Sequence, residues 1–260
     1  MSLDPPPYPE GRDLLRGKTV VVTAAAGTGI GFAAARRCAE EGARVLISDI
    51  HERRLAEAAD AMQDHTGQRP ETQLCDVTVE DDVQALIEAG AERLGGIDVL
   101  INNAGLGDTR HIVDMPDERW QKVLDVTLTG TFRMTRAGLR HMQPRGHGAI
   151  VNNASVIGWR AQAGQAHYAA AKAGVMALTR CAALEAAPHS VRVNCVAPSL
   201  AIHPFLAKVS SDEFLEGLKQ VEAFGRSAEV WEIANAMIFL ASDLSSYMTG
   251  EVLSVSSQHP

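Results

Sequence analysis

Three side chains near the middle of the chain have the types and the spacing needed for proton transfer. In the stretch SVIGWRAQAGQAHYAAAK, Ser155 supplies a hydroxyl, Tyr168 a phenol and Lys172 an amine. Tyr168 and Lys172 are four residues apart in a helical pattern, so we expect them on one face of a helix. A phenol has an ordinary pKa of about 10, and an adjacent ammonium favours its ionised form, so Tyr168 could exchange a proton at neutral pH. Ser155 would hold a substrate oxygen against that phenol.

Standing alone, a tyrosine and a lysine at this spacing could also be a surface pair on an alanine-rich helix, so the assignment depends on the elements around them. The first predicted strand, TVVVT (19–23), runs through the stretch TAAAGTGIG directly into a helix. Glycine lets the backbone approach a pyrophosphate closely, and a helix N-terminus offers N–H groups and a favourable dipole. This arrangement predicts a dinucleotide site. Its candidate contacts are Ala25, Gly27, Thr28, Gly29 and Ile30.

Asp49 ends the next predicted strand, twenty residues after Gly29, where a carboxylate would accept hydrogen bonds from an adenosine ribose. A carboxylate repels a 2′-phosphate, so Asp49 favours NAD(H) over NADP(H). Arg53 and Arg54 are near enough in the sequence to complicate this preference. We therefore expect NAD as the cofactor, with NADP as the less favoured alternative.

Further polar residues follow the third and fourth predicted strands. Ligands of an open parallel sheet bind outside the carboxyl ends of its strands, so these residues fall on the same edge as the glycine turn. The candidate cofactor contacts here are Asp76, Val77, Asn103, Ala104 and Gly105. Asp76 could equally cap a helix, and Asn102 and Asn103 could instead satisfy the backbone of a turn.

Short apolar runs alternate with helical patterns along the whole chain after residue 16. The runs that predict strands, two of them weakly, lie at 19–23, 43–48, 72–76, 97–102, 148–154, 191–196 and 251–255. The segments between them have apolar residues at helical spacing, including one long helix over 118–142. This alternation predicts an α/β fold with a doubly wound, seven-stranded parallel sheet. We expect it to form a single domain at 17–260, preceded by an N-terminal arm at 1–16. The strand-free stretch at about 198–225 is expected to be a mobile substrate lid.

Composition argues against several other kinds of partner. The formal net charge is −8 and no dense Lys/Arg run appears, so nucleic acid and anionic membranes are not expected as partners. The four cysteines include no CxxC pair, and His111, His167 and His203 have no metal-like spacing, so no metal is expected. No apolar run approaches a membrane span and the proline-rich start has no signal-peptide pattern, so we expect a soluble, cytoplasmic protein.

Together these motifs resemble the short-chain dehydrogenase/reductase family over essentially the whole chain after the arm. The resemblance rests on the glycine turn, Asp49, CDV (75–77), NNAG (102–105), Ser155, YAAAK (168–172), VRVNCVAPS (191–199), GR (225–226) and FLASDLSSYMTG (239–250). It implies a Rossmann sheet and reversible hydride transfer between nicotinamide and a carbonyl or secondary alcohol. It also implies that Tyr168 is the proton donor or acceptor, that Lys172 lowers its pKa and binds the nicotinamide ribose, and that Ser155 orients the substrate oxygen. Members are commonly homotetramers, with helices at 115–142 and 163–186 in one interface.

The chain departs from the family pattern at several positions. TAAAGTGIG is one residue longer than the usual turn, and Ala24 or Ala25 replaces its first glycine. Thr127 stands where the family has an active-site Asn, whose backbone holds a water of the proton relay, so Thr127 either does likewise or alters the relay. After the sixth strand the usual Pro-Gly and following Thr are replaced. Pro198 and Ala201 are the candidate cofactor contacts in this segment, and Ser199 and His203 the candidate substrate contacts.

The TAAAGTGIG and LDVTLTGTF variants are similar to those of actinobacterial family members that break down steroid rings, often as coenzyme A thioesters. Trp159 and Arg160 could line the substrate pocket, or could be a loop-packing residue and a solvated charge. We expect an NAD(H)-dependent enzyme that interconverts a secondary alcohol and a ketone on a hydrophobic small molecule, namely a cyclic, steroid-derived or acyl-CoA-linked compound. The alternatives are an NADPH-dependent 3-ketoacyl-thioester reductase and a non-catalytic, cofactor-binding regulatory protein.

Overall fold

The computed structural model describes residues 4–202 and 212–257 of the chain. The strands within these ranges are β1 (Thr19–Val22), β2 (Arg44–Asp49), β3 (Glu71–Leu74), β4 (Val99–Asn102), β5 (Gly148–Asn153), β6 (Val191–Pro198) and β7 (Val252–Val255). They form one sheet in the order β3-β2-β1-β4-β5-β6-β7, and every neighbouring pair is parallel. The predicted doubly wound, single-domain α/β fold is therefore confirmed.

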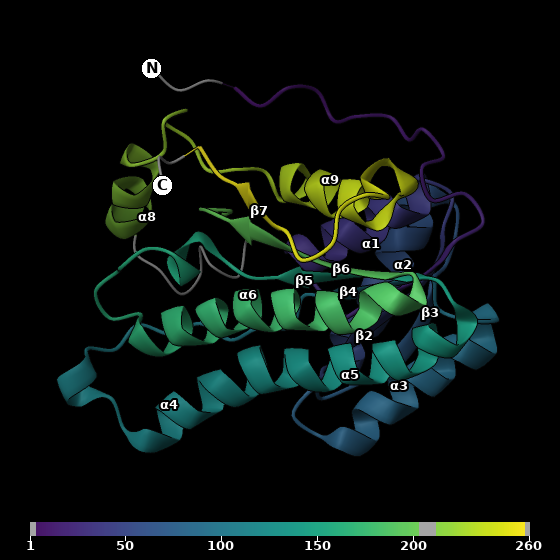
Figure 1. Cartoon of the computed structure of the whole chain (residues 1–260). Coiled ribbons are helices and arrows are strands. Elements are labelled where there is room, and N and C mark those ends of the chain that lie inside the picture. The colour runs from purple at the N-terminus through teal and green to yellow at the C-terminus, as the bar shows by residue number, and fades with distance from the viewer. Residues whose placement is uncertain (1–3, 203–211, 258–260) are drawn as a thin grey trace.

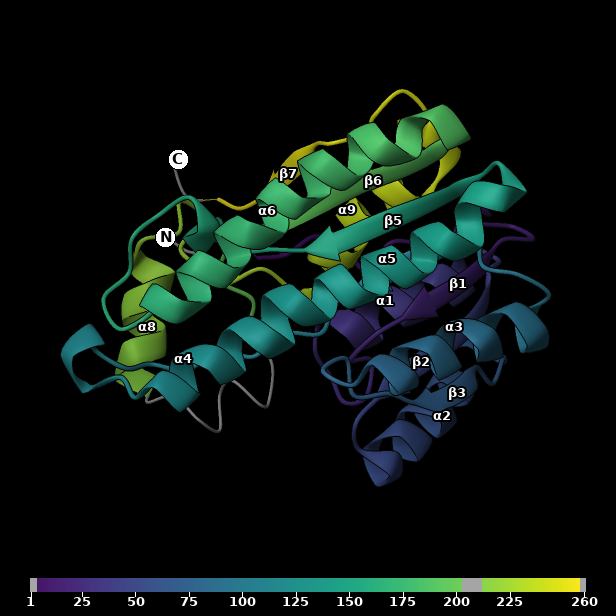
Figure 2. The same cartoon turned by 60° about the horizontal axis from the view of Figure 1, so that its bottom comes forward.

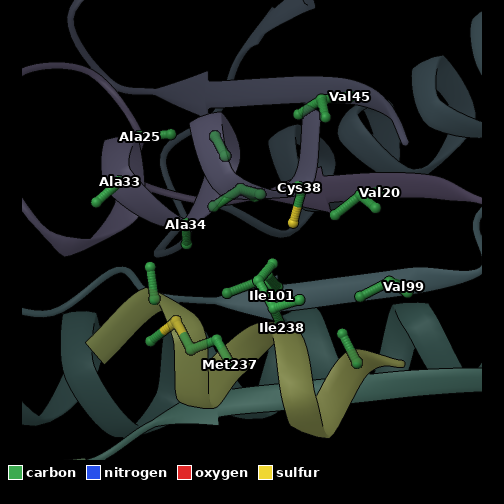
Figure 3. Packing of buried hydrophobic residues seen from close by; sticks show 14 of the residues in the cluster. Val20, Ala25, Ala33, Ala34, Cys38, Val45, Val99, Ile101, Met237 and Ile238 are labelled. Atoms are coloured by element: carbon green, nitrogen blue, oxygen red, sulfur yellow. The ribbon is translucent and has the colours of Figure 1, made fainter. Parts of the chain in front are cut away.

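Helices cover both faces of the sheet, as Figure 1 shows. One face carries α1 (Ile30–Glu40), α2 (Glu52–Thr66) and α9 (Val230–Ala241), and the other α3 (Glu80–Leu94), α5 (Gly130–Met142) and α6 (Ala166–Ala186). The small side chains of α1 let α9 approach it closely. In Figure 3, Ala34 and Cys38 of α1 face Met237 and Ile238 of α9 inside the buried core. Because both faces are covered, the central strands are continuous apolar runs.

The long helix expected over 118–142 is interrupted. The structure has α4 (Asp117–Leu124), a π-helical turn η2 (Asp125–Thr129) and then α5, and Figure 2 shows α4 and α5 following one another beside α6. A π-helical turn inserts one residue into a helix without ending it, so the apolar periodicity of the sequence does not reveal it. Such turns are frequent at functional sites, and this one contains Thr127.

The strand order places the expected cofactor edge between β1 and β4. From β1 the chain moves outward through β2 to β3, and it then returns to the other side of β1 with β4. The loops that follow β1 and β4 consequently diverge at this point, which opens a crevice at the carboxyl ends of the strands. The glycine turn after β1 and the NNAG stretch after β4 both lie there.

Two peripheral segments complete the fold. The described part of the N-terminal arm lies against α1 and α9: Tyr8 packs edge-on against Trp231 at 5.5 Å between ring centroids, and its hydroxyl donates to Glu40 at 2.6 Å. In the expected lid, Ala201 pairs with Ala228 in an isolated parallel bridge, and α8 (Asp212–Gln220) follows. Residues 203–211 are outside the described ranges, so the lid's mobility stays a prediction.

Two kinds of feature are absent from the described residues. Within 4–202 and 212–257, no helix is both long enough and apolar enough to span a bilayer. In the same ranges, no three or more His, Cys, Asp or Glu side chains are grouped in a way that could hold a metal ion.

Candidate active site

A cleft of about 1260 Å³ opens at the carboxyl edge of the sheet. It is lined by the glycine turn, the end of β2, the loops after β3 and β4, and the first part of α6. Predicted site residues in its lining are Gly27, Thr28, Gly29, Ile30, Asp49, Asp76, Val77, Asn103, Ala104, Gly105, Tyr168 and Lys172. The fold thus brings together residues that are up to 145 positions apart (172 − 27).

Some predicted cofactor contacts lie outside this lining. Ala25 is fully buried beneath the turn, where its N–H donates to Ser48 O at 2.9 Å. Pro198 is buried at the end of β6, and Ala201 is buried in its bridge to Ala228. Contacts of these three residues with a cofactor therefore stay predictions.

The glycine turn differs from the usual pattern at Ala24. Its φ of +51° is in the left-handed region that normally favours glycine, so this alanine takes the conformation of the missing first glycine. The side-chain amide of Asn103 donates to Ala24 O at 3.1 Å and to Thr23 O at 3.3 Å, which holds the turn. A Cβ on Gly31 would lie 2.4 Å from both Ala24 O and Asn103 Nδ2, so glycine is required where α1 meets the turn.

Helix α1 begins beside the cleft with Gly29 as its N-cap and no side-chain cap. Gly29 thus leaves the N–H groups of the first turn without a cap from its own side chain, and these groups form the positive end of the helix dipole. Gly27, with φ of +109° and no atom within 4 Å of a Cβ built on it, leaves open space in front of this helix end. Such a cradle fits an anionic group, and in particular a pyrophosphate.

Asp49 also lines the cleft, with only 8% of its surface exposed. Burial raises the pKa of this carboxyl, and the positive charge of Arg54 opposes that rise. The Arg54 guanidinium is 3.6 Å from Asp49 Oδ1, whereas Arg53 is mostly exposed and pairs with Glu57 at 3.4 Å. Of the two arginines considered from the sequence, Arg54 is thus the one that lines the cleft.

Tyr168 and Lys172 line the cleft, and Ser155, which is not part of the lining, contacts Tyr168. Ser155 follows β5, and its hydroxyl donates weakly to Pro198 O at 3.4 Å and forms a hydrogen bond with Tyr168. Lys172 is buried one helical turn beyond Tyr168, with its Nζ 5.4 Å from the centre of the tyrosine ring. The three side chains therefore occupy one site, as their spacing predicts.

The electrostatics of this site differ from the expectation that Lys172 lowers the pKa of Tyr168. Burial raises the pKa of Tyr168 to about 12, against a lowering contribution from the Ser155 hydrogen bond. Burial also lowers the pKa of Lys172 to about 8. The Lys172 ammonium donates to Asn153 O at 2.6 Å, so its hydrogen-bond partner is a main-chain carbonyl. In this geometry the phenol keeps its proton at neutral pH, which is the state that can donate to a carbonyl oxygen.

Thr127 is completely buried and contacts the residue that follows NNAG. Its hydroxyl accepts from Leu106 N at 2.9 Å and lies 3.2 Å from Leu106 O, to which it can donate. Its own carbonyl accepts the Thr131 hydroxyl at 2.8 Å. Thr127 therefore holds the start of the loop after β4, and its place in a proton relay stays a prediction.

Asn153 is a site residue that the sequence reasoning missed. Its main-chain carbonyl accepts a hydrogen bond from the Lys172 ammonium, and its side-chain amide donates one to Asn103 Oδ1 at 2.9 Å. Because Asn103 in turn holds Ala24, a chain of hydrogen bonds links the glycine turn to Lys172 across β1, β4 and β5. The available signal was the pair of asparagines, Asn152 and Asn153, at the end of an otherwise apolar strand.

Three of the predicted substrate residues, Trp159, Arg160 and Ser199, lie outside the cleft lining. Trp159 is half exposed after the short turn that follows Ser155, and Arg160 comes next to it. Ser199 follows β6 and donates its N–H to Val255 O at 3.1 Å. His203 is outside the described residues. Contact of any of these residues with a substrate stays a prediction.

The chain is similar to known proteins over nearly its whole length. The family described as enoyl-(acyl carrier protein) reductase matches residues 24–257. A (5R,7aS)-5-hydroxy-7a-methyl-1-oxo-2,3,5,6,7,7a-hexahydro-1H-indene-carboxyl-CoA reductase of Mycobacterium tuberculosis is 60% identical over 251 residues, 96% of each protein. The 3-oxoacyl-(acyl-carrier-protein) reductase FabG of Vibrio cholerae is 38% identical over 241 residues, 93% of this chain and 96% of that protein. The crystal structure of a short chain dehydrogenase from Mycobacterium smegmatis is 55% identical, covers 99% of both chains and superposes with a TM-score of 0.88.

Proposed function

The chain belongs to the short-chain dehydrogenase/reductase family and is an oxidoreductase, and from that premise we propose that it interconverts a secondary alcohol and a ketone with NAD(H). The observation that carries the proposal is that Tyr168 and Lys172 line the same cleft as Asp49 and that Ser155 forms a hydrogen bond with Tyr168. A site built only to bind a dinucleotide would not need the hydroxyl, phenol and amine together.

The residues of the cleft fit a nicotinamide dinucleotide. The uncapped start of α1 and the open space at Gly27 suit its pyrophosphate, and the Asp49 carboxylate suits the adenosine ribose hydroxyls. For the other ribose the candidate partner is Lys172, which lines the cleft with Gly105. When bound, this cofactor supplies or accepts the hydride.

Within this proposal the chain's own residues hold and move the proton. Ser155 donates a hydrogen bond to the substrate oxygen and keeps it beside Tyr168. In the reductive direction the Tyr168 hydroxyl gives its proton to that oxygen, and in the oxidative direction the phenolate takes it back. The hydrogen bond from the Lys172 ammonium to Asn153 O fixes where that positive charge lies, 5.4 Å from the centre of the tyrosine ring. Proton transfer of this kind contributes roughly 10²–10⁴ in rate.

Asp49→Ala is expected to reduce discrimination between the two cofactors. The variant removes the ribose acceptor, so NADH should bind about tenfold more weakly, and it removes the repulsion of a 2′-phosphate, so NADPH should bind more tightly. The measurement is the dissociation constant of each cofactor by fluorescence titration. Arg53→Ala, on the exposed pair with Glu57, is the control and should change neither constant. An unchanged ratio in Asp49→Ala would contradict the role of this carboxylate.

For the substrate we propose a hydrophobic cyclic ketone or alcohol carried as a coenzyme A thioester. The support is the 60% identical relative, whose name describes a bicyclic carboxyl-CoA compound. The FabG relative and the Arg54 guanidinium at the adenosine end of the cleft favour a second candidate, an NADPH-dependent 3-ketoacyl-thioester reductase.

One assay separates these candidates. Purified protein is offered NADH and NADPH separately with cyclic ketones, their coenzyme A thioesters and straight-chain 3-ketoacyl thioesters. The proposal expects NADH-dependent turnover with the highest kcat/KM on cyclic thioesters. A preference for NADPH and straight-chain thioesters would establish the second candidate instead. Cofactor binding without turnover on any substrate would point to a regulatory protein.

The homotetramer expected from the family stays a proposal as well. Its support is apolar surface on the helices concerned, where Trp120, Phe132 and Leu184 are exposed in the single chain. Light scattering should return the molar mass of four chains, and a monomeric mass would exclude this assembly.

A further inference from the structure

We propose that Gln165 is a positioning residue that sets the width of the substrate side of the site, by tying the loop after β4 to the catalytic end of α6. The inference rests on the proposed function, because it concerns how a carbonyl substrate is held against Tyr168. The contacts that support it belong to residues 105–110 and 164–168.

The side chain of Gln165 is nearly buried and both of its N–H donors are used. Gln165 is the N-cap residue of α6, three positions before Tyr168. Its Nε2 donates to Asp108 O at 2.8 Å and to Thr109 Oγ1 at 3.0 Å. A rotatable surface amide would not be expected to hold two partners in one loop, so this side chain acts as a fixed clamp between the two segments.

The clamped loop passes beside the tyrosine. A Cβ built on Gly107 would lie 3.8 Å from both Cδ2 and Cε2 of Tyr168, so the loop packs against one edge of that ring, and both residues line the cleft. The start of the loop is held by Thr127 through Leu106, and its end by the bond from Arg110 N to Gly164 O at 2.8 Å. Gln165 holds its middle and is the anchor closest to Tyr168 along the chain.

This geometry affects the chemical step more than cofactor binding. The substrate oxygen must lie within hydrogen-bond distance of both Ser155 and Tyr168, and a misplacement of about 1 Å can reduce the rate roughly a hundredfold. The pyrophosphate and adenosine ends of the cleft are built from the glycine turn and Asp49, which Gln165 does not contact. Loss of the clamp should therefore lower kcat/KM for the ketone and leave the affinity for NADH nearly unchanged.

The test uses Gln165→Glu, which keeps the shape of the side chain. Ionised, the introduced carboxylate has no donor for the Asp108 carbonyl; protonated, it has one. The ionisable groups around it are Asp108 and Arg119, which pair with each other, the exposed Arg110, and His167, which is completely buried two positions further along the chain. Burial and the Asp108 carboxylate raise the pKa of the new carboxyl, and Arg119 and Arg110 lower it. Activity relative to wild type should therefore recover as the pH falls.

Expected values follow for kcat/KM of the ketone between pH 6 and pH 8. Gln165→Glu should be about 30-fold below wild type at pH 8 and about fivefold below it at pH 6. Gln165→Leu, which never donates, should be equally low at both pH values. The matched control is Gln162→Glu, in the segment that precedes α6, and it should stay near wild type. In all three variants the NADH dissociation constant should change less than about threefold.

Two results would overturn the inference. One is a wild-type kcat/KM for Gln165→Glu at pH 8. The other is a loss in Gln165→Glu that does not change between pH 6 and pH 8, as in Gln165→Leu. Amide hydrogen exchange of residues 106–111 tests the clamp without any substrate. Gln165→Leu should exchange faster there than wild type, and equal rates would also overturn the clamp. Absence of turnover in the wild type would instead contradict the proposed function, while the exchange comparison still decides the clamp.

Discussion

Tyr168→Phe is expected to lower kcat about a thousandfold and to change the NADH dissociation constant less than about threefold. The phenylalanine ring keeps the packing of Tyr168 on α6, but it lacks the proton that the reaction transfers and the hydrogen bond to Ser155. The measurement is steady-state turnover with the best substrate of the panel, together with a fluorescence titration of NADH.

The matched control for this variant is Tyr247→Phe, because Tyr247 is fully exposed near the end of the chain. It should retain wild-type turnover. Substantial activity in Tyr168→Phe would show that another group transfers the proton. A parallel loss of NADH affinity would show that the phenol contributes mainly to cofactor binding.

Lys172→Met is expected to lower kcat by at least about a hundredfold and to lose stability relative to wild type as the pH is raised from about 7 to 9.5. The lowering of the Lys172 pKa from 10.5 to about 8 corresponds to roughly 3 kcal/mol of unfavourable burial of charge. That cost is complete below about pH 8, where the lysine is charged in both the folded and the unfolded state. Between about pH 8 and 10.5 the folded lysine is neutral while the unfolded one still binds a proton, so the stability of the wild type rises.

Methionine does not titrate, so this rise in stability with pH is absent from Lys172→Met. The unfolding free energy of the wild type should therefore increase with pH relative to that of the variant. At pH 7 the variant avoids the buried charge but leaves the Asn153 carbonyl without its donor, so it should be about as stable as wild type or more stable. The measurement is urea unfolding at pH 7, 8.5 and 9.5. The contribution of Tyr168 to stability begins to change only near its unfolded pKa of about 10, and both proteins contain this residue. Lys18→Met, on a partly exposed lysine at the start of β1, is the control. A gap between wild type and Lys172→Met that does not change with pH would contradict a buried, charged lysine.

Both predictions concern a site whose parts were largely visible in the sequence. Alternating apolar runs and helical patterns predicted the parallel sheet, because the period of side-chain exposure depends only on the local geometry of strands and helices. The carboxyl-edge rule then placed the glycine turn, Asp49 and Ser155 on one side of the molecule. Tyr168 and Lys172 needed only the helical spacing of four residues to share a face.

Other features could not be predicted from the sequence because they depend on contacts between distant segments. The π-helical turn at Thr127 leaves the apolar pattern of one long helix intact. Choosing between Arg53 and Arg54 required knowing which side of α2 faces Asp49. The partner of Lys172 is a main-chain carbonyl of β5, which no residue type can signal.

By itself, the sequence determined the kinds of chemistry that the chain carries and the edge of the sheet at which they occur. Residue type, helical spacing and the alternation of strands and helices along the chain are local properties, and each follows from neighbours in the sequence. The tertiary structure alone decided how these groups act together: the clamp of Gln165 on the loop at 108–109, the hydrogen-bond path from Ala24 through Asn103 to Asn153, and the protonation states of Tyr168 and Lys172. Those depend on burial and on distances of a few ångströms between residues far apart in sequence, and packing of the whole domain sets both.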